Sequence, residues 1–154
     1  MSMSEINIQR DDFDSGVEIA RLRENSNSIG AVASFVGVVS SHNENAEVMS
    51  LTLEHYPGMT EKTIANIIAE SKQRWPLLGV KVIHRIGELH STDQIVFVGV
   101  ASRHRGAAFS ACEFIMDFLK TQAPFWKKEK TSEGERWVDA RVTDSDALSR
   151  WRSS

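Results

Sequence analysis

Short stretches of alternating or continuous apolar residues recur along this chain and predict a set of β-strands. Alternation predicts strands over about residues 6–8, 48–55, 80–86 and 136–140. The runs at 30–39 and 94–101 are almost continuously apolar, which is typical of central strands. Gly37, inside the first of these runs, indicates a β-bulge or a close approach of another backbone.

Helical periodicity separates these strands. A capping box at Ser15 and Glu18 predicts a first helix, and Thr60 is a candidate cap for a second helix that ends at Pro76. Apolar residues at helical spacing predict a third helix over 106–120, and 145–151 indicates a short terminal one. The polar stretch 40–47 is expected to form a loop and 87–93 a turn.

Strands and helices therefore mix, with short connections. This order predicts an α+β fold, in which one largely antiparallel sheet is covered by helices. The length of 154 residues favours a single domain over residues 1–154.

Composition narrows the possible functions. The formal net charge is −3, which disfavours nucleic-acid binding as the main role. No apolar run is long enough to span a membrane, and the first residues do not form a signal peptide, so we expect a soluble cytoplasmic protein. The single cysteine, Cys112, excludes an internal disulfide and is expected to be buried in the third helix. The histidines lack metal-ligand spacing, so no metal site is predicted.

Basic residues concentrate in one segment of this acidic chain. Residues 101–130 contain six Lys or Arg residues and three acidic residues, a local charge of +3, which indicates a local anion site. His104 and Arg105 follow a strand and precede a helix, where backbone amides favour anions. Lys120 lies about 21 Å further along that helix, so a shared site would need another segment or another subunit.

Lys120 and Lys127 can share a site more easily, because the chain turns at Pro124 between them. We expect both ammonium groups in one cleft, with Phe125 and Trp126 packed as anchors. Two cations about 4 Å apart repel by roughly 4 kcal/mol at an effective dielectric of about 20, and an anionic substrate would relieve that repulsion. Three alternatives stay open: Lys120 pairs with Asp117, residues 127–130 form a solvated charged run, and His104 has a structural role.

Several segments resemble the large, catalytic subunit of molybdopterin synthase. The matching runs are GAVASFVGVV, LTLEHYPGMTEK, RWPL, VIHRIGEL, IVFVGVASRHR, AFSACEFIMDFLKTQAPFWKKE and GERWVDAR, and they cover about residues 29–141. The resemblance implies a fold like an α/β hammerhead with an additional small antiparallel β portion.

The resemblance also implies an activity. The family converts the cyclic pyranopterin monophosphate called precursor Z into molybdopterin by building its dithiolene, with no required cofactor. Sulfur arrives as the C-terminal thiocarboxylate of a small ubiquitin-like carrier subunit that ends in Gly-Gly. The large subunit forms the homodimer core of a heterotetramer with one carrier at each end.

The family's functional residues match positions of this chain. The resemblance implies that Lys120 and Lys127 are catalytic. The implied substrate-binding and pocket-supporting residues are Val38, Val39, Ser40, His104, Arg105, Lys128 and Glu129, and Phe35, Arg103, Met116 and Arg141.

One position departs from the family pattern. Ser40 stands where the family often has an arginine, so a guanidinium that could bind phosphate or carboxylate is missing. Either Arg103, Lys128 or another cation replaces it, or the protein binds substrate more weakly. Two other functions compete with catalysis: a non-catalytic docking partner of a ubiquitin-like protein, and a small nucleic-acid-binding domain that uses Arg103, Arg105, Trp126 and Lys127.

Overall fold

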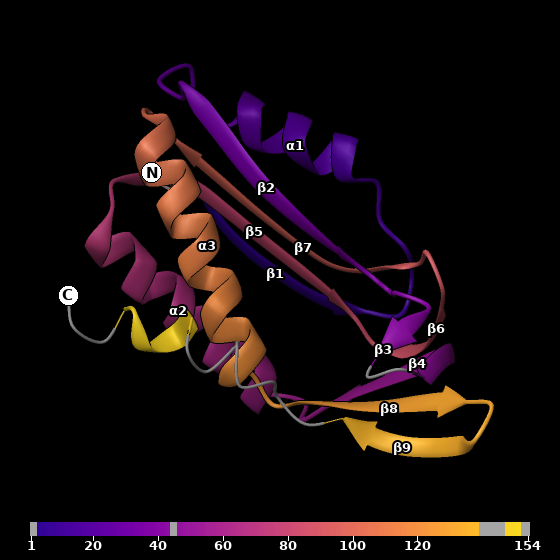
Figure 1. Cartoon of the computed structure of the whole chain (residues 1–154). Coiled ribbons are helices and arrows are strands. Elements are labelled where there is room, and N and C mark those ends of the chain that lie inside the picture. Colours follow the sequence, from indigo (N-terminus) through magenta and orange to yellow (C-terminus); the bar gives the residue numbers. More distant parts are fainter. Residues whose placement is uncertain (1–2, 44–45, 139–146, 152–154) are drawn as a thin grey trace.

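A computed structural model describes residues 3–43, 46–138 and 147–151 (Figure 1). Its labelled helices are α1 (Ser15–Glu24), α2 (Met59–Arg74) and α3 (Arg105–Thr121), and residues 147–149 add a single helical turn near the predicted terminal helix. The strands are β1 (Met3–Gln9), β2 (Ala31–Val38), β3 (His42–Asn43), β4 (Ala46–His55), β5 (Leu77–Arg85), β6 (Gly87–His90), β7 (Gln94–Ser102), β8 (Phe125–Thr131) and β9 (Gly134–Val138). The predicted α+β class is confirmed.

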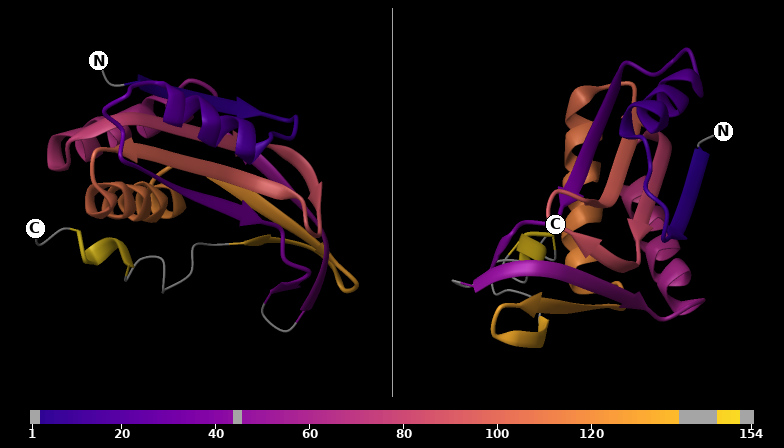
Figure 2. Two further views of the ribbon diagram at one scale, coloured as in Figure 1. Left: turned by 90° about the horizontal axis from the view of Figure 1, so that it is seen from above. Right: turned by 90° about the vertical axis from the view of Figure 1, so that its right-hand side faces the viewer.

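The main sheet has four strands in the order β1-β5-β7-β2. Strand β1 runs parallel to β5, and the other pairs are antiparallel. Side chains of β5 and β7 alternate between two cores: Val80, Val82, Val98 and Val100 pack with α2 and α3, whereas Ile83 and Phe97 pack with Leu22 of α1. Helices therefore cover both faces of the sheet, with α1 opposite α3 (Figure 2).

A second sheet, of five strands, lies beyond one end of the first (Figure 1). It has the order β3-β4-β8-β9, and β6 also pairs with β4. Val39, Leu51, Leu53 and Leu89 form a separate small core behind it. This sheet is the additional antiparallel β portion that the resemblance implied.

The prediction that residues 30–39 form a central strand is wrong about position. Strand β2 pairs only with β7 within the described residues, so it is an edge strand. Ala31 and Ala33 pack in the core on the α3 side, and Val32 and Val36 pack in the core on the α1 side, so the run is apolar on both faces without a second neighbouring strand. The bulge predicted at Gly37 is confirmed by a register shift between Gly37 and Val38.

Two polar stretches contain more structure than predicted. Residues 87–93 do not form a simple turn, because β6 begins at Gly87 and buries Leu89 between two exposed residues. Residues 40–47 include β3, which pairs with the start of β4. In both places a strand of two to four residues is too short to give a clear alternating pattern.

Two helix starts also differ from prediction. Asp14 caps α1, because its carboxylate accepts a hydrogen bond from the amide of Val17 at 3.1 Å, so Ser15 is already inside the helix. Helix α2 begins after Gly58, and Thr60 is fully buried, with its hydroxyl donating to the carbonyl of Tyr56 at 2.8 Å. The cap of α1 is thus one residue before the predicted one, whereas the cap of α2 is Gly58, whose amide donates to the Glu61 carboxylate at 2.8 Å.

Gly30 fixes the segment that leads from β7 into α3. Its amide donates to the carbonyl of Ser102 at 3.0 Å, and a Cβ at this position would lie 2.3 Å from the backbone oxygen of Arg103. Backbone cannot retreat as a flexible side chain can, so only glycine fits here.

We therefore predict that Gly30→Ala lowers the free energy of unfolding by about 2 kcal/mol or more, as overpacking against a fixed backbone does. Gly106→Ala is the matched control, because nothing lies within 4 Å of a Cβ there. It should leave stability unchanged or raise it by up to about 1 kcal/mol. Urea unfolding of both variants measures the difference, and equal stability would contradict the close contact.

Candidate functional site

A pocket of about 270 Å³ lies where the C-terminal end of α3 meets the two sheets. It collects residues from β2, β5, β7, α3 and β8. Most of its walls are apolar, and its polar side chains are two lysines and one histidine. The lining residues are Phe35, Val36, Gly37, Val38, His84, Ile95, Val96, Met116, Leu119, Lys120, Ala123, Phe125 and Lys127.

Lys120 and Lys127 both line this pocket, as the sequence predicted. Lys120 lies in the last turn of α3. Lys127 follows two residues after Phe125 on β8, and side chains two apart on a strand share a face. Both side chains therefore line one pocket, where a single bound anion would interact favourably with both positive charges.

The alternative pairing of Lys120 with Asp117 does not occur in the described residues. The Asp117 carboxylate instead accepts hydrogen bonds from Arg150 at 2.9 Å and from the indole of Trp151 at 2.6 Å. Arg150 and Trp151 thus occupy the Asp117 carboxylate in place of Lys120.

Phe125 and Trp126 have different roles, contrary to the prediction that both are anchors. Phe125 lines the pocket, whereas Trp126 points to the other face of β8 and is 47% exposed. Adjacent residues of a strand face opposite sides, so only one of the two rings can pack inward.

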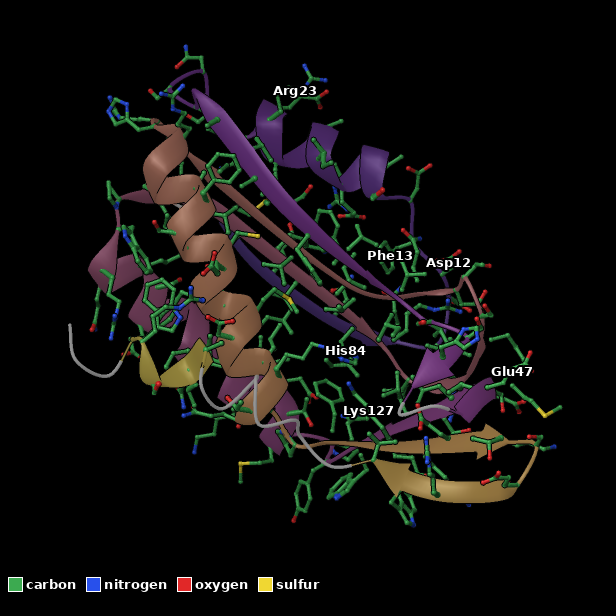
Figure 3. All side chains as sticks on the ribbon, in the orientation of Figure 1. Asp12, Phe13, Arg23, Glu47, His84 and Lys127 are labelled. Atoms are coloured by element: carbon green, nitrogen blue, oxygen red, sulfur yellow. The ribbon has the colours of Figure 1, made fainter. Side chains whose placement is uncertain are left out.

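Sequence reasoning missed His84, a residue of β5 that is only 7% exposed and lines the pocket. The ring stacks on Phe125 with centroids 3.7 Å apart and planes inclined by 14°. Figure 3 shows His84 and Lys127 between the C-terminal end of α3 and β8. The available signal was a histidine in an otherwise apolar alternating strand.

Burial lowers the pKa of His84 from 6.5 to about 4. Its Nδ1 atom, 2.8 Å from the carbonyl oxygen of Arg85, opposes this effect, and the positive charges of Lys127 and Lys120 add to it. His55, across Phe125, is the remaining titratable neighbour. His84 is therefore neutral at physiological pH.

Lys128 and Glu129 are engaged with β9. The Lys128 ammonium lies 2.8 Å from Glu135 and over the ring of Trp137, and hydrogen bonding to Glu135 raises its pKa. Glu129 is buried and accepts from Arg136 at 3.2 Å. Residues 127–130 therefore belong to a strand in which side chains on one face are more buried than those on the other, and they do not form a uniformly solvated charged run.

His104, Arg105 and Arg103 lie at the opposite end of α3 from the pocket (Figure 1). All three are exposed. The separation along the helix axis exceeds about 20 Å, so one copy of the chain does not bring them to Lys120.

The remaining predicted residues fall in three groups. Phe35, Val38 and Met116 line the pocket. Val39 is buried in the small core behind the second sheet, and Ser40 is exposed beside it, with its hydroxyl 3.3 Å from the carbonyl of His42. Arg141 lies outside the described residues.

Other catalytic chemistry finds little support in the described part of the chain. Cys112 is buried, and burial raises the pKa of its thiol to about 11, so it stays protonated near neutral pH. No group of three or more His, Cys, Asp or Glu residues there could hold a metal ion. Among the described helices, none is both long enough and apolar enough to cross a membrane.

Comparisons with known proteins agree on one family. The model of the MoaE protein family matches residues 8–122. The molybdopterin synthase catalytic subunit of Ralstonia nicotianae is 60% identical over 149 residues, which cover 97% of this chain and 85% of that protein. The subunit of the same name from Escherichia coli is 54% identical over 151 residues, which cover 98% and 100%.

Solved structures give the same result. Molybdopterin cofactor biosynthesis protein E from Burkholderia multivorans matches with a TM-score of 0.83 and 54% identity over 97% of each chain. Molybdopterin synthase from Staphylococcus aureus matches with a TM-score of 0.80 and 30% identity, covering 86% of this chain and 96% of that one.

The buried, neutral His84 predicts a pH-dependent stability. Because its folded pKa lies below its ordinary value, the unfolded state binds the proton more tightly, and stability falls as pH drops from 6.5 towards 4. A shift of this size contributes roughly 3 kcal/mol to that loss.

His84→Gln should remove this part of the decrease in the free energy of unfolding at low pH. Urea unfolding at pH 7 and pH 4.5 measures the decrease in both proteins. The lowered carboxyl pKa values of Glu5 and Asp12 also reduce stability at low pH, but the variant and the unsubstituted protein share this effect. An identical loss in the two proteins would show that His84 is not held neutral by burial.

Proposed function

The chain belongs to the MoaE protein family, and from that premise we propose that it transfers sulfur to precursor Z through the pocket that contains Lys120 and Lys127. Its class of activity is that of the molybdopterin synthase catalytic subunits it matches at 54–60% identity, a sulfur-transferring enzyme of molybdenum cofactor biosynthesis. The observation that carries the assignment of residues is the convergence of the two lysines on one small, mostly apolar pocket.

The electrostatics of the pocket suit this reaction. Precursor Z carries a phosphate and the carrier tail carries a thiocarboxylate, so the reactants repel each other. Two ammonium groups offset that repulsion, and apolar walls strengthen their effect by excluding water. The described lining residues include no carboxylate that would oppose an anion.

The two lysines take different roles in the proposal. Lys120 orients the thiocarboxylate, polarises its carbonyl and moves protons during transfer. Lys127 holds the carrier tail and stabilises the negative charge that develops on the acyl oxygen. A partner subunit supplies the sulfur, and we propose that it is a small ubiquitin-like carrier whose Gly-Gly terminus enters this pocket.

His104 and Arg105 enter the proposal through a second copy of the chain. They are more than about 20 Å from the pocket of their own copy, and both are exposed. We propose that in a homodimer they reach the pocket of the mate and bind the substrate phosphate. Arg103, which directly precedes this pair, would then be available to replace the guanidinium that is missing at Ser40.

Lys120→Ala should reduce the rate of molybdopterin formation by about 10²-fold or more, the effect of removing a group that stabilises transition-state charge. Binding of the carrier, measured by calorimetry, should survive. Lys130→Ala is the control, because Lys130 is exposed on the opposite face of β8 from Lys127. Normal turnover by the Lys120→Ala variant would refute the role of Lys120. If the unsubstituted protein forms no dithiolene, the result would favour the docking-partner alternative.

Mixing variants tests the proposed dimer. Lys120→Ala and the double variant His104→Ala, Arg105→Ala should each be nearly inactive alone. If a pocket takes residues from both copies, mixed dimers contain one intact pocket, so about a quarter to a half of the activity should return on mixing. Subunit exchange is verified by mass spectrometry. If no activity returns, Lys120 and the His104–Arg105 pair act within one copy, or the pair takes no part in the reaction.

A further inference from the structure

The pocket contains a hydrogen-bond acceptor that the proposed function does not yet use. Of the thirteen residues that line it, nine carry apolar side chains, one is glycine and two are lysines that can only donate. The thirteenth, His84, is the only one of these described lining residues whose side chain offers a nitrogen or oxygen acceptor.

The local geometry decides which nitrogen accepts. Nδ1 of His84 lies 2.8 Å from the carbonyl oxygen of Arg85, and a carbonyl can only accept, so Nδ1 carries the hydrogen. In a neutral imidazole the other nitrogen, Nε2, then holds a free lone pair. The stack on Phe125 keeps the ring from turning, so this lone pair has a fixed direction.

Nε2 makes no hydrogen bond to another residue in the described part of the chain, although His84 is only 7% exposed. It is not a fully enclosed atom without a partner, since the one such side-chain atom among the described residues is Oε1 of Glu61. The ring lines the pocket, so a group bound there can reach Nε2.

We propose that Nε2 of His84 accepts a hydrogen bond from an N–H group of the bound reactants, which makes His84 a substrate-binding residue. The proposal rests on the proposed function. The lysines bind the anionic ends of the reactants but cannot bind a donor. His84 supplies the complementary contact, and a donor placed on it would be held beside both ammonium groups.

Two sources could provide this donor. One is the backbone amide of the glycines at the end of the carrier tail, and the other is a ring or exocyclic N–H of the pterin. Either source requires a neutral His84. Burial lowers the pKa of this residue, so it is neutral near neutral pH.

Two substitutions of His84 distinguish the effect of the Nε2 acceptor from the effect of the rest of the side chain. His84→Gln places a carbonyl oxygen near the position of Nε2, whereas His84→Asn can keep the donor to Arg85 but has no atom that reaches so far. Both lose the aromatic ring, so a difference between them reports on the acceptor and not on the stack. Unfolding in urea verifies that both variants fold.

Binding of each reactant is then measured separately. A synthetic peptide with the carrier's C-terminal sequence gives Kd by fluorescence anisotropy, and precursor Z gives KM in the complete reaction. We expect His84→Asn to raise either the peptide Kd or the KM for precursor Z by about fivefold to tenfold, the usual value of one neutral hydrogen bond. His84→Gln should stay within about twofold of the unsubstituted protein. A change in peptide Kd identifies the tail amide as the donor, and a change in KM identifies the pterin.

Nitrogen NMR of the ¹⁵N-histidine-labelled, unsubstituted protein reads the contact directly. The unprotonated Nε2 signal of His84 should move when the donating reactant is added, because its lone pair becomes hydrogen-bonded. No movement with either reactant, or equal effects of Asn and Gln, would overturn the proposal. Failure of the proposed function is a different result: no molybdopterin would form, while the Nε2 signal would still report whether His84 binds a donor.

Discussion

The stack of His84 on Phe125 connects the two sheets of this protein. His84 belongs to β5 of the main sheet, and Phe125 begins β8 of the second sheet. With ring centroids 3.7 Å apart, the contact holds β8 where its inward side chains face α3. The pocket lies beside this contact, and Lys127 comes two residues later on the same strand face. The position of one ring pair therefore sets the position of a charged group.

The distribution of charge follows from the same arrangement. Apolar residues of β2, β7 and α3 line the pocket beside the two lysines, of which Lys120 is exposed and Lys127 half-buried. The acidic side chains nearby are engaged elsewhere, Asp117 with Arg150 and Trp151, and Glu129 with Arg136. The pocket is thus prepared for an anion, although the whole chain has a net charge of −3.

The sequence predicted the fold class, most strands and the meeting of Lys120 and Lys127, because alternation and a proline between two lysines are local signals. It did not reveal that β2 is an edge strand, since an apolar run looks the same beside a strand, a helix or a pocket. His84 was missed because its role depends on Arg85, Phe125 and two lysines from other elements. Contacts between distant elements have no pattern that a single sequence displays.

The central claim is that Lys120 and Lys127 act together on one incoming peptide terminus, and lysine acetylation with mass spectrometry tests it most directly. The protein is acetylated briefly with and without a saturating thiocarboxylated carrier. The account predicts that the carrier protects Lys120 and Lys127 to the same extent, while Lys62, exposed on α2, reacts equally in both samples. Protection of only one of the pair, or of neither, would contradict it.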